Sequence, residues 1–320
     1  MMLPLSALLL LLPSALAGAD IAAPPPTLVE HPIASGSTPV YLDGSAWTAT
    51  NAGWAPAAEV PLPATVPGDI ITDLQRAKRV QDPYYNVTWR DPAFISAWHD
   101  GTWTYSKTFP TTSAMLAPAA AETLLVMDGV RMGATVTLNG HVLGNITDQF
   151  LRYEYPVCKL LLPVSGKANA LSVTFDKMIP TGGRSTYSNQ IDWAPVFATT
   201  DPTSGTAPDA QRIPGRETFG FGIWKSVYLL PVAPKAVAIT QLVLHTFYAG
   251  GHPICILSDT THEGFELRAR VVMWAPTATT GHVTVALPDL SGATVTVQAS
   301  VNEGYSNISV IVPAAGAIFD

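Results

Sequence analysis

The sequence predicts an all-β protein built from two successive β-sandwiches, with one short helix in the first. Proline and glycine are abundant, at 28 and 24 of 320 residues, and they separate short apolar runs as turns separate strands. Within most runs the apolar residues recur at every second position, the period of a strand with one buried face. Hydrophobic residues make up 48% of the chain and charged residues 13%, so there is enough apolar surface for a core.

The first 17 residues have the pattern of a secretory signal peptide, and residues 18–39 form a proline-rich lead-in behind it. Leu3–Leu12 is a leucine-rich run, and Ala15–Leu16–Ala17 is a small-x-small cleavage site. The run is shorter than the roughly 20 apolar residues that a membrane span needs. An uncleaved anchor is the alternative, but the cleavage site favours removal of the leader.

Three N-glycosylation sequons agree with export. Their acceptor asparagines are Asn86, Asn145 and Asn307. Together with the leader they predict the secretory pathway, with a lysosome or the extracellular space as the destination.

The first sandwich is expected at residues 40–231. A strand pair is predicted on the two sides of Asp43–Gly44, a turn dipeptide, within Val40–Ala49. A helix is predicted at Asp69–Val80, because apolar residues recur there at helical spacing and Asp69 can cap the first turn. Its inner face would hold Ile70, Ile71, Leu74 and Ala77.

The rest of this domain has the two-residue period of strands. Asn139–Gly140 is the strongest kind of two-residue hairpin signal. Strands are predicted at 103–109, 124–127, 135–138, 142–143, 152–157, 170–175 and 224–230. Short strands with tight turns and one helix favour a two-sheet jelly roll.

A second sandwich is expected at residues 235–320, after the natural boundary at Pro231–Pro234. Strands are predicted there at 237–247, 265–274, 281–287, 294–299 and 307–312. The architecture resembles an immunoglobulin-type sandwich, and we expect it to be incomplete at Asp320. No strand–helix alternation indicates a (β/α)₈ barrel, which needs about 250 residues.

Charge and composition exclude several function classes. The net charge is -7 and no basic stripe is present, so we expect neither a nucleic-acid partner nor a membrane partner after leader cleavage. The seven histidines are scattered without ligand spacing, and no glycine-rich phosphate loop occurs, so no metal or cofactor is expected. The two cysteines, Cys158 and Cys255, could pair in an exported protein, and the sequence leaves that open.

Short motifs between Val66 and Leu229 form an ordered series. In chain order they are Val66–Pro67–Gly68, Asp82–Pro83–Tyr84–Tyr85, Trp103–Thr104–Tyr105, Asp128–Gly129, Leu138–Asn139–Gly140, Asp192–Trp193–Ala194–Pro195 and Gly222–Ile223–Trp224. The series resembles the galactose-binding-like N-terminal domain of glycoside hydrolase family two, in its β-mannosidase branch. Residues after Pro234 resemble the immunoglobulin-like domain that follows in that family.

The resemblance implies a sugar-binding role for one loop. In the β-mannosidase branch a loop from this domain reaches into the sugar pocket of a catalytic barrel. By that resemblance Asp192 would accept hydrogen bonds from sugar hydroxyls, Trp193 would line the pocket, and Arg184 would lie nearby. Ile191 stands where the family has a tryptophan, and Ala194 where it has a glycine.

The resemblance therefore implies the non-catalytic N-terminal portion of a β-mannosidase-like exoglycosidase. The parent enzyme would remove terminal non-reducing β-D-mannose from oligosaccharides, and the partner of this chain would be a mannoside in a pocket shared with a barrel. Catalytic residues are not expected here, because Asn302–Glu303, the one dipeptide similar to the family's acid/base, lies in a predicted turn. A stand-alone secreted lectin-like module and an inactive remnant remain as alternatives.

Overall fold

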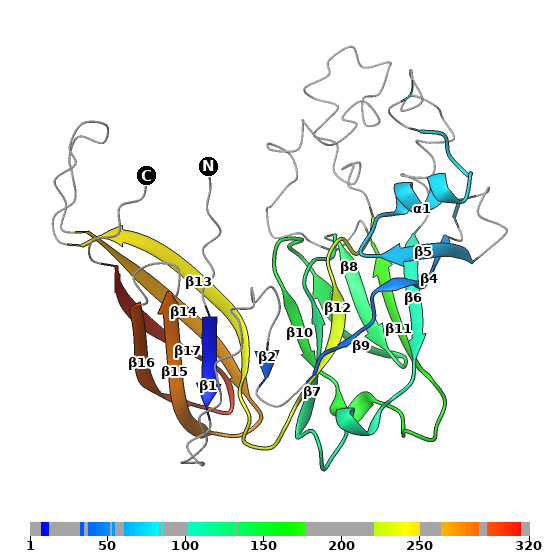
Figure 1. Cartoon of the computed structure of the whole chain (residues 1–320). Coiled ribbons are helices and arrows are strands. Elements are labelled where there is room, and N and C mark those ends of the chain that lie inside the picture. The colour runs from blue at the N-terminus through cyan, green and yellow to red at the C-terminus, as the bar shows by residue number, and fades with distance from the viewer. Residues whose placement is uncertain are drawn as a thin grey trace. The chain divides into compact units, whose positions relative to one another are not determined.

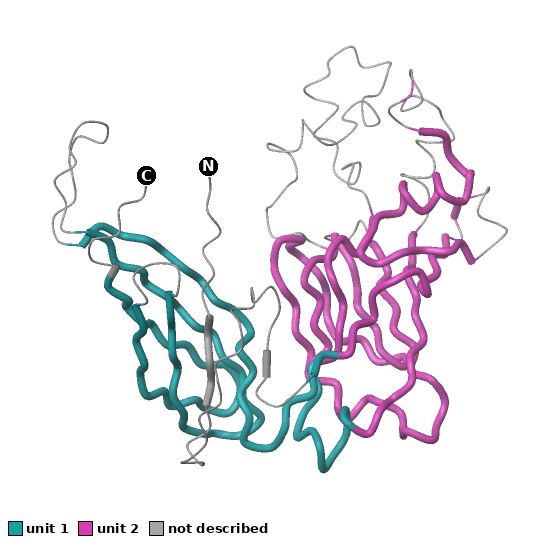
Figure 2. The backbone as a smooth tube through the Cα atoms, viewed as in Figure 1, with its two compact units in different colours: residues 1–39, 114–123, 230–320 teal, residues 40–113, 124–229 magenta. Residues whose placement is uncertain are grey.

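The computed structural model describes residues 8–12, 33–34, 38–51, 53–54, 61–82, 85, 102–131, 133–176, 179, 221–249, 264–287 and 293–314. This part of the chain is mostly β-strand with one α-helix, which confirms the predicted all-β fold class (Figure 1). None of its helices is long and apolar enough to cross a membrane. The chain forms two compact units, and the second comprises Val40–Ser113 and Leu124–Leu229 (Figure 2).

Unit 2 is a two-sheet sandwich. The larger sheet has the order β5-β4-β6-β11-β8-β9, formed by β4 (Gly44–Asn51), β5 (Leu62–Val66), β6 (Trp103–Phe109), β8 (Ala134–Leu138), β9 (His141–Ile146) and β11 (Asn169–Phe175). The smaller has the order β10-β7-β12-β3, formed by β3 (Val40–Tyr41), β7 (Glu122–Met127), β10 (Tyr153–Pro156) and β12 (Val227–Val232). Two 3₁₀ turns lie at η3 (Ser113–Met115) and η4 (Cys158–Leu160).

Aromatic residues predicted from the period of two fill the core of unit 2. On β6, Trp103, Tyr105 and Phe109 are buried, as alternation requires. Trp47 is also buried, and its indole N–H donates to the carbonyl of Leu42 at 2.7 Å. A buried indole that keeps a hydrogen-bond partner adds apolar area without a desolvation cost.

The predicted Asn139–Gly140 hairpin is confirmed. Both residues have positive φ, 51° and 84°, as a type I′ turn between β8 and β9 requires. The Asn139 amide also donates to the carbonyl of Leu160 at 2.8 Å and to Asn169 Oδ1 at 2.9 Å. The turn is therefore held by neighbours far along the chain as well as by its own geometry.

The predicted strand pair at Asp43–Gly44 is wrong. β3 pairs with β12, whereas β4 pairs with β5 and β6, so the two strands belong to different sheets. Asp43 Oδ1 accepts the backbone N–H of Val227 at 2.9 Å, and Gly44 has a φ of 105°. This long-range bond and the glycine conformation carry the chain from one sheet to the other.

Helix α1 (Ile70–Arg76) starts where predicted and ends earlier. Asp69 caps it, accepting the backbone N–H groups of Ile71 and Thr72 at 2.9 and 3.0 Å. Lys78, with a φ of 58°, ends it: its N–H donates to Gln75 O, and Arg79 N–H donates to Leu74 O. This bond pair is a Schellman motif, which glycine forms more often than lysine.

Unit 1 comprises Met1–Pro39, Ala114–Thr123 and Leu230–Asp320. One sheet has the order β17-β14-β13-β2, formed by β2 (Ile33–Ala34), β13 (Ala238–Tyr248), β14 (Phe265–Ala275) and β17 (Gly304–Ala314). The other has the order β1-β15-β16, formed by β1 (Leu8–Leu12), β15 (Thr279–Leu287) and β16 (Ala293–Val301). Buried side chains from β13, β14 and β17 form one core with those from β15 and β16. The immunoglobulin-type label for this sandwich stays a prediction.

Candidate functional site

The three predicted sugar-binding residues, Arg184, Asp192 and Trp193, lie outside the described residues, as do Asn86 and Cys255. Pairing of Cys158 with Cys255 therefore stays open. The other two predicted glycosylation sites are described: Asn145 is exposed on β9 and Asn307 is exposed on β17.

The chain that bears Arg184, Asp192 and Trp193 is anchored at both ends within unit 2. It follows β11, whose last residue is Phe175, and the described chain resumes at Phe221. The rings of Phe175 and Phe221 lie 5.5 Å apart, and the N–H of Asp176 donates to Gly133 O at 2.7 Å. The two anchor points of this segment are therefore in contact with each other.

Three of the sequence motifs meet beside Phe221, where the described chain resumes. They are Val66–Pro67–Gly68, Asp128–Gly129 and Gly222–Ile223–Trp224. Gly68 N–H donates to Ile223 O and Ile70 N–H to Phe221 O, each at 2.8 Å. Ile223 also forms an isolated β-bridge with Val130, directly after Asp128–Gly129. Backbone hydrogen bonds thus tie the start of helix α1, the end of β7 and the Gly222–Ile223–Trp224 motif into one cluster.

Gly222 is needed where these segments approach most closely. A Cβ atom at this position would lie 2.6 Å from the carbonyl oxygen of Gly68 and 2.7 Å from Cα of Asp69. Both contacts are with backbone, which cannot move aside as a flexible side chain can. The glycine of this motif therefore serves close packing against the cap of α1.

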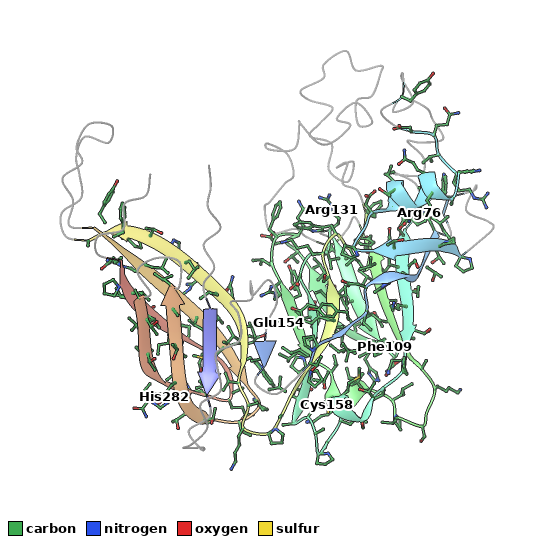
Figure 3. All side chains as sticks on the ribbon, in the orientation of Figure 1. Arg76, Phe109, Arg131, Glu154, Cys158 and His282 are labelled. Carbon is green, nitrogen blue, oxygen red and sulfur yellow. The ribbon has the colours of Figure 1, made fainter. Side chains whose placement is uncertain are left out.

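Arg131 and Trp224 form the polar and aromatic part of the cluster, and Arg131 lies with Arg76 toward one end of unit 2 (Figure 3). The Arg131 guanidinium is 6.0 Å from the Trp224 ring centre, and its Nη1 donates to Gln149 Oε1 at 2.8 Å. Phe150, with 58% of its surface exposed, meets the Trp224 ring edge-on at 6.3 Å. Burial lowers the pKa of the Arg131 guanidinium, and the negative charge of Asp69 partly offsets this by raising it.

Two buried donors of this cluster have no hydrogen-bond partner within the part of the chain that the structure describes. They are Arg131 Nε and Trp224 Nε1. Buried N–H groups in proteins are nearly always paired, and leaving one unpaired costs about 1–3 kcal/mol. The cluster therefore offers hydrogen-bond donors to an oxygen acceptor.

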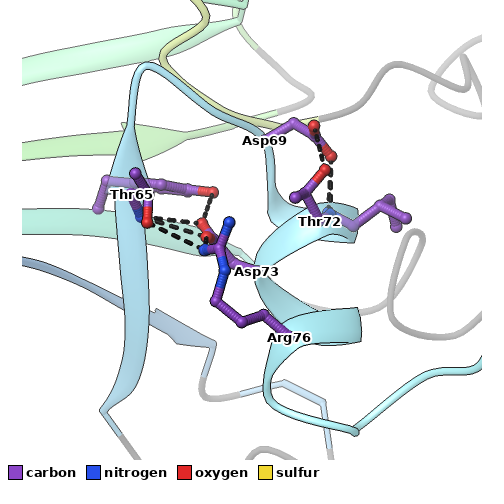
Figure 4. Close-up of polar contacts among 7 residues, drawn as sticks. Thr65, Asp69, Thr72, Asp73 and Arg76 are labelled. Atoms are coloured by element: carbon purple, nitrogen blue, oxygen red, sulfur yellow. Dashed lines mark hydrogen bonds and ion pairs between the residues drawn. The ribbon is translucent and has the colours of Figure 1, made fainter. Parts of the chain in front are cut away.

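Asp73 is a buried carboxylate with a structural role (Figure 4). It accepts from Arg76 Nη1 at 2.8 Å, from the Thr65 backbone N–H at 3.2 Å and from the Tyr105 hydroxyl at 3.2 Å. Burial raises its pKa to about 6, although these three donors lower it. The carboxylate thereby fastens α1 to β5 and β6.

Asp128 is the other buried carboxylate among the described residues. Its Oδ1 accepts from Arg152 Nε at 2.5 Å and from the Tyr228 hydroxyl at 3.4 Å. Burial raises the pKa of Tyr228, and the charge of Asp128 raises it further. Each of these two carboxylates is therefore engaged with its own arginine.

Sequence reasoning missed Arg131, Gln149 and Phe150, because none of them belongs to a recognised motif. A signal was present in Phe150–Leu151, an apolar pair that remains exposed in the turn before β10. The described residues hold no group of three or more His, Cys, Asp or Glu side chains that could bind a metal ion.

Comparison with known proteins finds a family match and several relatives. Residues 47–215 match the family described as glycosyl hydrolase 2 galactose-binding domain-like. The β-mannosidase of Rattus norvegicus is 28% identical over 141 residues, which is 44% of this chain and 14% of that protein. β-Mannosidase A of Emericella nidulans is 30% identical over 128 residues, 40% of this chain and 12% of that protein.

The fold has a counterpart among solved structures. The β-D-mannosidase of Dictyoglomus thermophilum superposes with a TM-score of 0.55 and 16% identity, covering 87% of this chain and 31% of that one. The chain thus spans a small part of the relatives it matches. Since the family match covers just over half of the chain, the chain belongs to the glycosyl hydrolase 2 galactose-binding domain-like family.

Proposed function

We propose that this chain is the non-catalytic N-terminal portion of a β-mannosidase-like exoglycosidase. Its role is to supply one wall of a pocket for a terminal β-D-mannose residue, whose other walls and catalytic acids belong to a barrel. The observation that carries the proposal is the pair of anchors, Phe175 and Phe221, at the ends of the segment that bears Asp192 and Trp193.

The chemistry of that segment suits a sugar. An aspartate can accept hydrogen bonds from two adjacent hydroxyls, and bonds to a charged acceptor are stronger than neutral ones. An indole covers the apolar face of a pyranose at little entropy cost. Anchoring both ends of the segment on a rigid sandwich would reduce the entropy lost when it holds a ligand.

The described carboxylates support a scaffolding role. Retaining glycosidases use two carboxyl groups about 5 Å apart, one as the acid/base and one as the nucleophile. Asp73 and Asp128 are instead engaged with Arg76 and Arg152. Glu303 lies exposed in the turn between β16 and β17, as the sequence predicted, and not at the end of a barrel strand.

The role of Asp192 can be tested in a chimera. The full chain would replace the matching N-terminal part of the Emericella nidulans relative, upstream of that enzyme's own barrel. We expect the chimera to hydrolyse an aryl β-mannoside, and Asp192→Asn to lower kcat/KM by about 10- to 100-fold, the value of one charge-assisted hydrogen bond. Asp148→Asn is the matched control. A folded chimera without turnover, or equal activity of both variants, contradicts the proposal.

The galactose-binding-like family match favours a second candidate, a lectin-like module that binds sugar unaided. Titration calorimetry of the chain with methyl β-mannoside and methyl β-galactoside separates the two. A pocket shared with a barrel predicts binding weaker than millimolar for both sugars. Binding at millimolar affinity or tighter, lost on Trp193→Ala, supports the lectin instead.

We also propose that the chain enters the secretory pathway and acts in a lysosome or outside the cell. The leader-like residues 1–17 and the three sequons support this location. The N-terminal sequence of the exported chain tests it: cleavage after Ala17 is expected, and a chain that stays inside the cell with Met1 intact contradicts it.

A further inference from the structure

The sequon at Asn307 lies on an exposed face of β17. Along this strand Tyr305, Asn307 and Ser309 are exposed, whereas Val310 and Val312 are buried in the core of unit 1. Because strand residues alternate, Tyr305, Asn307 and Ser309 share the outer face of the sheet. β17 is the outermost strand in the order β17-β14-β13-β2.

Tyr305 presents a large aromatic surface next to that asparagine. It keeps 56% of its surface exposed, among the largest values for an apolar side chain in the described residues. Residues two apart on one strand lie about 7 Å from each other, and their side chains stand side by side. A pyranose attached to Asn307 Nδ2 can therefore lie back over the Tyr305 ring.

The two surfaces are chemically complementary. One face of N-acetylglucosamine carries axial C–H bonds with slight positive charge, and the face of a tyrosine ring is negative. Directly across the sheet, Asn307 faces Val272 and Ser309 faces Arg270, whereas Tyr305 faces Trp274, so an indole lies beside the Tyr305 ring on the same face. A sugar that covers the exposed Tyr305 ring removes apolar surface from water. Because this contact forms only in the folded chain, it stabilises the folded state relative to the unfolded state.

From this geometry we propose that Asn307 carries an N-linked glycan whose first N-acetylglucosamine packs on Tyr305 and stabilises unit 1. The co-reactant is a lipid-diphosphate oligosaccharide of the secretory pathway. Nδ2 of Asn307 displaces the diphosphate from C1 of that sugar: a C1–N bond forms, the C1–O bond breaks, the lipid diphosphate leaves and the amide loses one proton. This inference does not depend on any hydrolytic role of the chain.

Asn145 provides a matched control within the same molecule. It is also an exposed sequon asparagine on an outermost strand, β9, but the residue two places before it is Leu143. Its Oδ1 accepts a hydrogen bond from Thr135 Oγ1 at 3.0 Å. Because the residue two places before Asn145 carries no aromatic ring, a glycan here should contribute less to stability.

The test uses the full chain behind a supplied secretion leader, so that export itself is not in question. Peptide mass mapping should find a glycan on Asn307. Trimming to a single N-acetylglucosamine should keep the unfolding midpoint of unit 1, and Asn307→Gln should lower it by about 4 °C, a shift typical of a modest contact in a small domain. Asn145→Gln should change it less.

The role of the ring is isolated by a double-mutant cycle. In Tyr305→Phe the glycan should stabilise as before, and in Tyr305→Ala its effect should vanish. NMR spectra should show the sugar C–H protons shifted to higher field by the ring current of Tyr305. This shift should disappear in Tyr305→Ala, and a general loss of stability does not produce that change. An unmodified Asn307 in the exported chain, or equal glycan stabilisation with and without Tyr305, would overturn the proposal.

Discussion

The indole of Trp224 occupies the space beside the α-carbon of Gly129. A Cβ atom at position 129 would lie 2.9 Å from Cε2 of the indole, 3.0 Å from its Nε1 and 2.9 Å from Cγ of Lys225. Gly129 is not among the glycines with positive φ, so its small size is what matters. The sequence pattern Asp128–Gly129 is typical of a turn. In the structure, the Trp224 ring packs against Gly129.

We expect Gly129→Ala to destabilise unit 2 by about 1–3 kcal/mol, because the added methyl group overpacks a rigid indole. Urea unfolding followed by tryptophan fluorescence or circular dichroism measures this. The double variant Gly129→Ala with Trp224→Leu should recover part of the loss, since the smaller side chain makes room. Strictly additive losses in the double variant would show that the two residues do not compete for space.

Unfolding of unit 2 should depend on pH through Asp73. Its pKa is raised to about 6 in the folded chain, against about 4 for an unfolded aspartate. The folded state therefore binds this proton more tightly. The contribution of Asp73 to stability is fully present below pH 4 and is lost as the pH rises through about 6, by up to about 3 kcal/mol.

Asp73→Asn removes this titration, so its unfolding free energy should fall less than that of the original chain between pH 4 and pH 7. Glu303→Gln, the same chemical change in an exposed turn, is the control and should keep the original slope. An Asp73→Asn profile that overlays the original one contradicts the assignment.

The ion pair of Asp128 with Arg152 should be worth more than a surface pair. Removing one partner of a buried ion pair is costly, so Asp128→Ala should cost about 3 kcal/mol. The pair of Glu266 with Arg268 in unit 1 is more exposed, and Glu266→Ala should cost less than about 1 kcal/mol. Chemical denaturation of both variants gives the comparison, and similar costs would refute the structural role of Asp128.

Lys78→Gly should stabilise the chain by about 0.5–1 kcal/mol. Lys78 ends α1 with a φ of 58°, a conformation that strains any residue with a Cβ. Lys159 in η4 does not share this conformation, so Lys159→Gly should be neutral or destabilising. Thermal unfolding of the two variants decides it, and a lower midpoint for Lys78→Gly would contradict the prediction.

The sequence predicts the elements that local chemistry decides. The Asn139–Gly140 turn, the inner face of β6 and the cap at Asp69 are set by residues close together in the chain. Prediction from the sequence fails where residues far apart in the chain determine the local structure. The sheet change at Asp43 depends on Val227, and the burial of Asp73 depends on Tyr105. The helix end at Lys78 was missed because no glycine marks it.

For the candidate site, the sequence yields the motifs but not their meeting. Gly68, Asp128 and Ile223 are far apart in the chain, and only the fold brings their segments together. The predicted ligand contacts of Arg184, Asp192 and Trp193 stay predictions that rest on resemblance. What the structure adds is the contact of Phe175 with Phe221 at the two ends of their segment.

The most direct test of the scaffold account is incubation of the purified chain with an aryl β-mannoside. The account predicts no release of the phenol above the buffer rate, because the described buried carboxylates hold the fold and the catalytic pair belongs to a barrel. Steady turnover by the chain alone, abolished by Glu303→Gln, would contradict it.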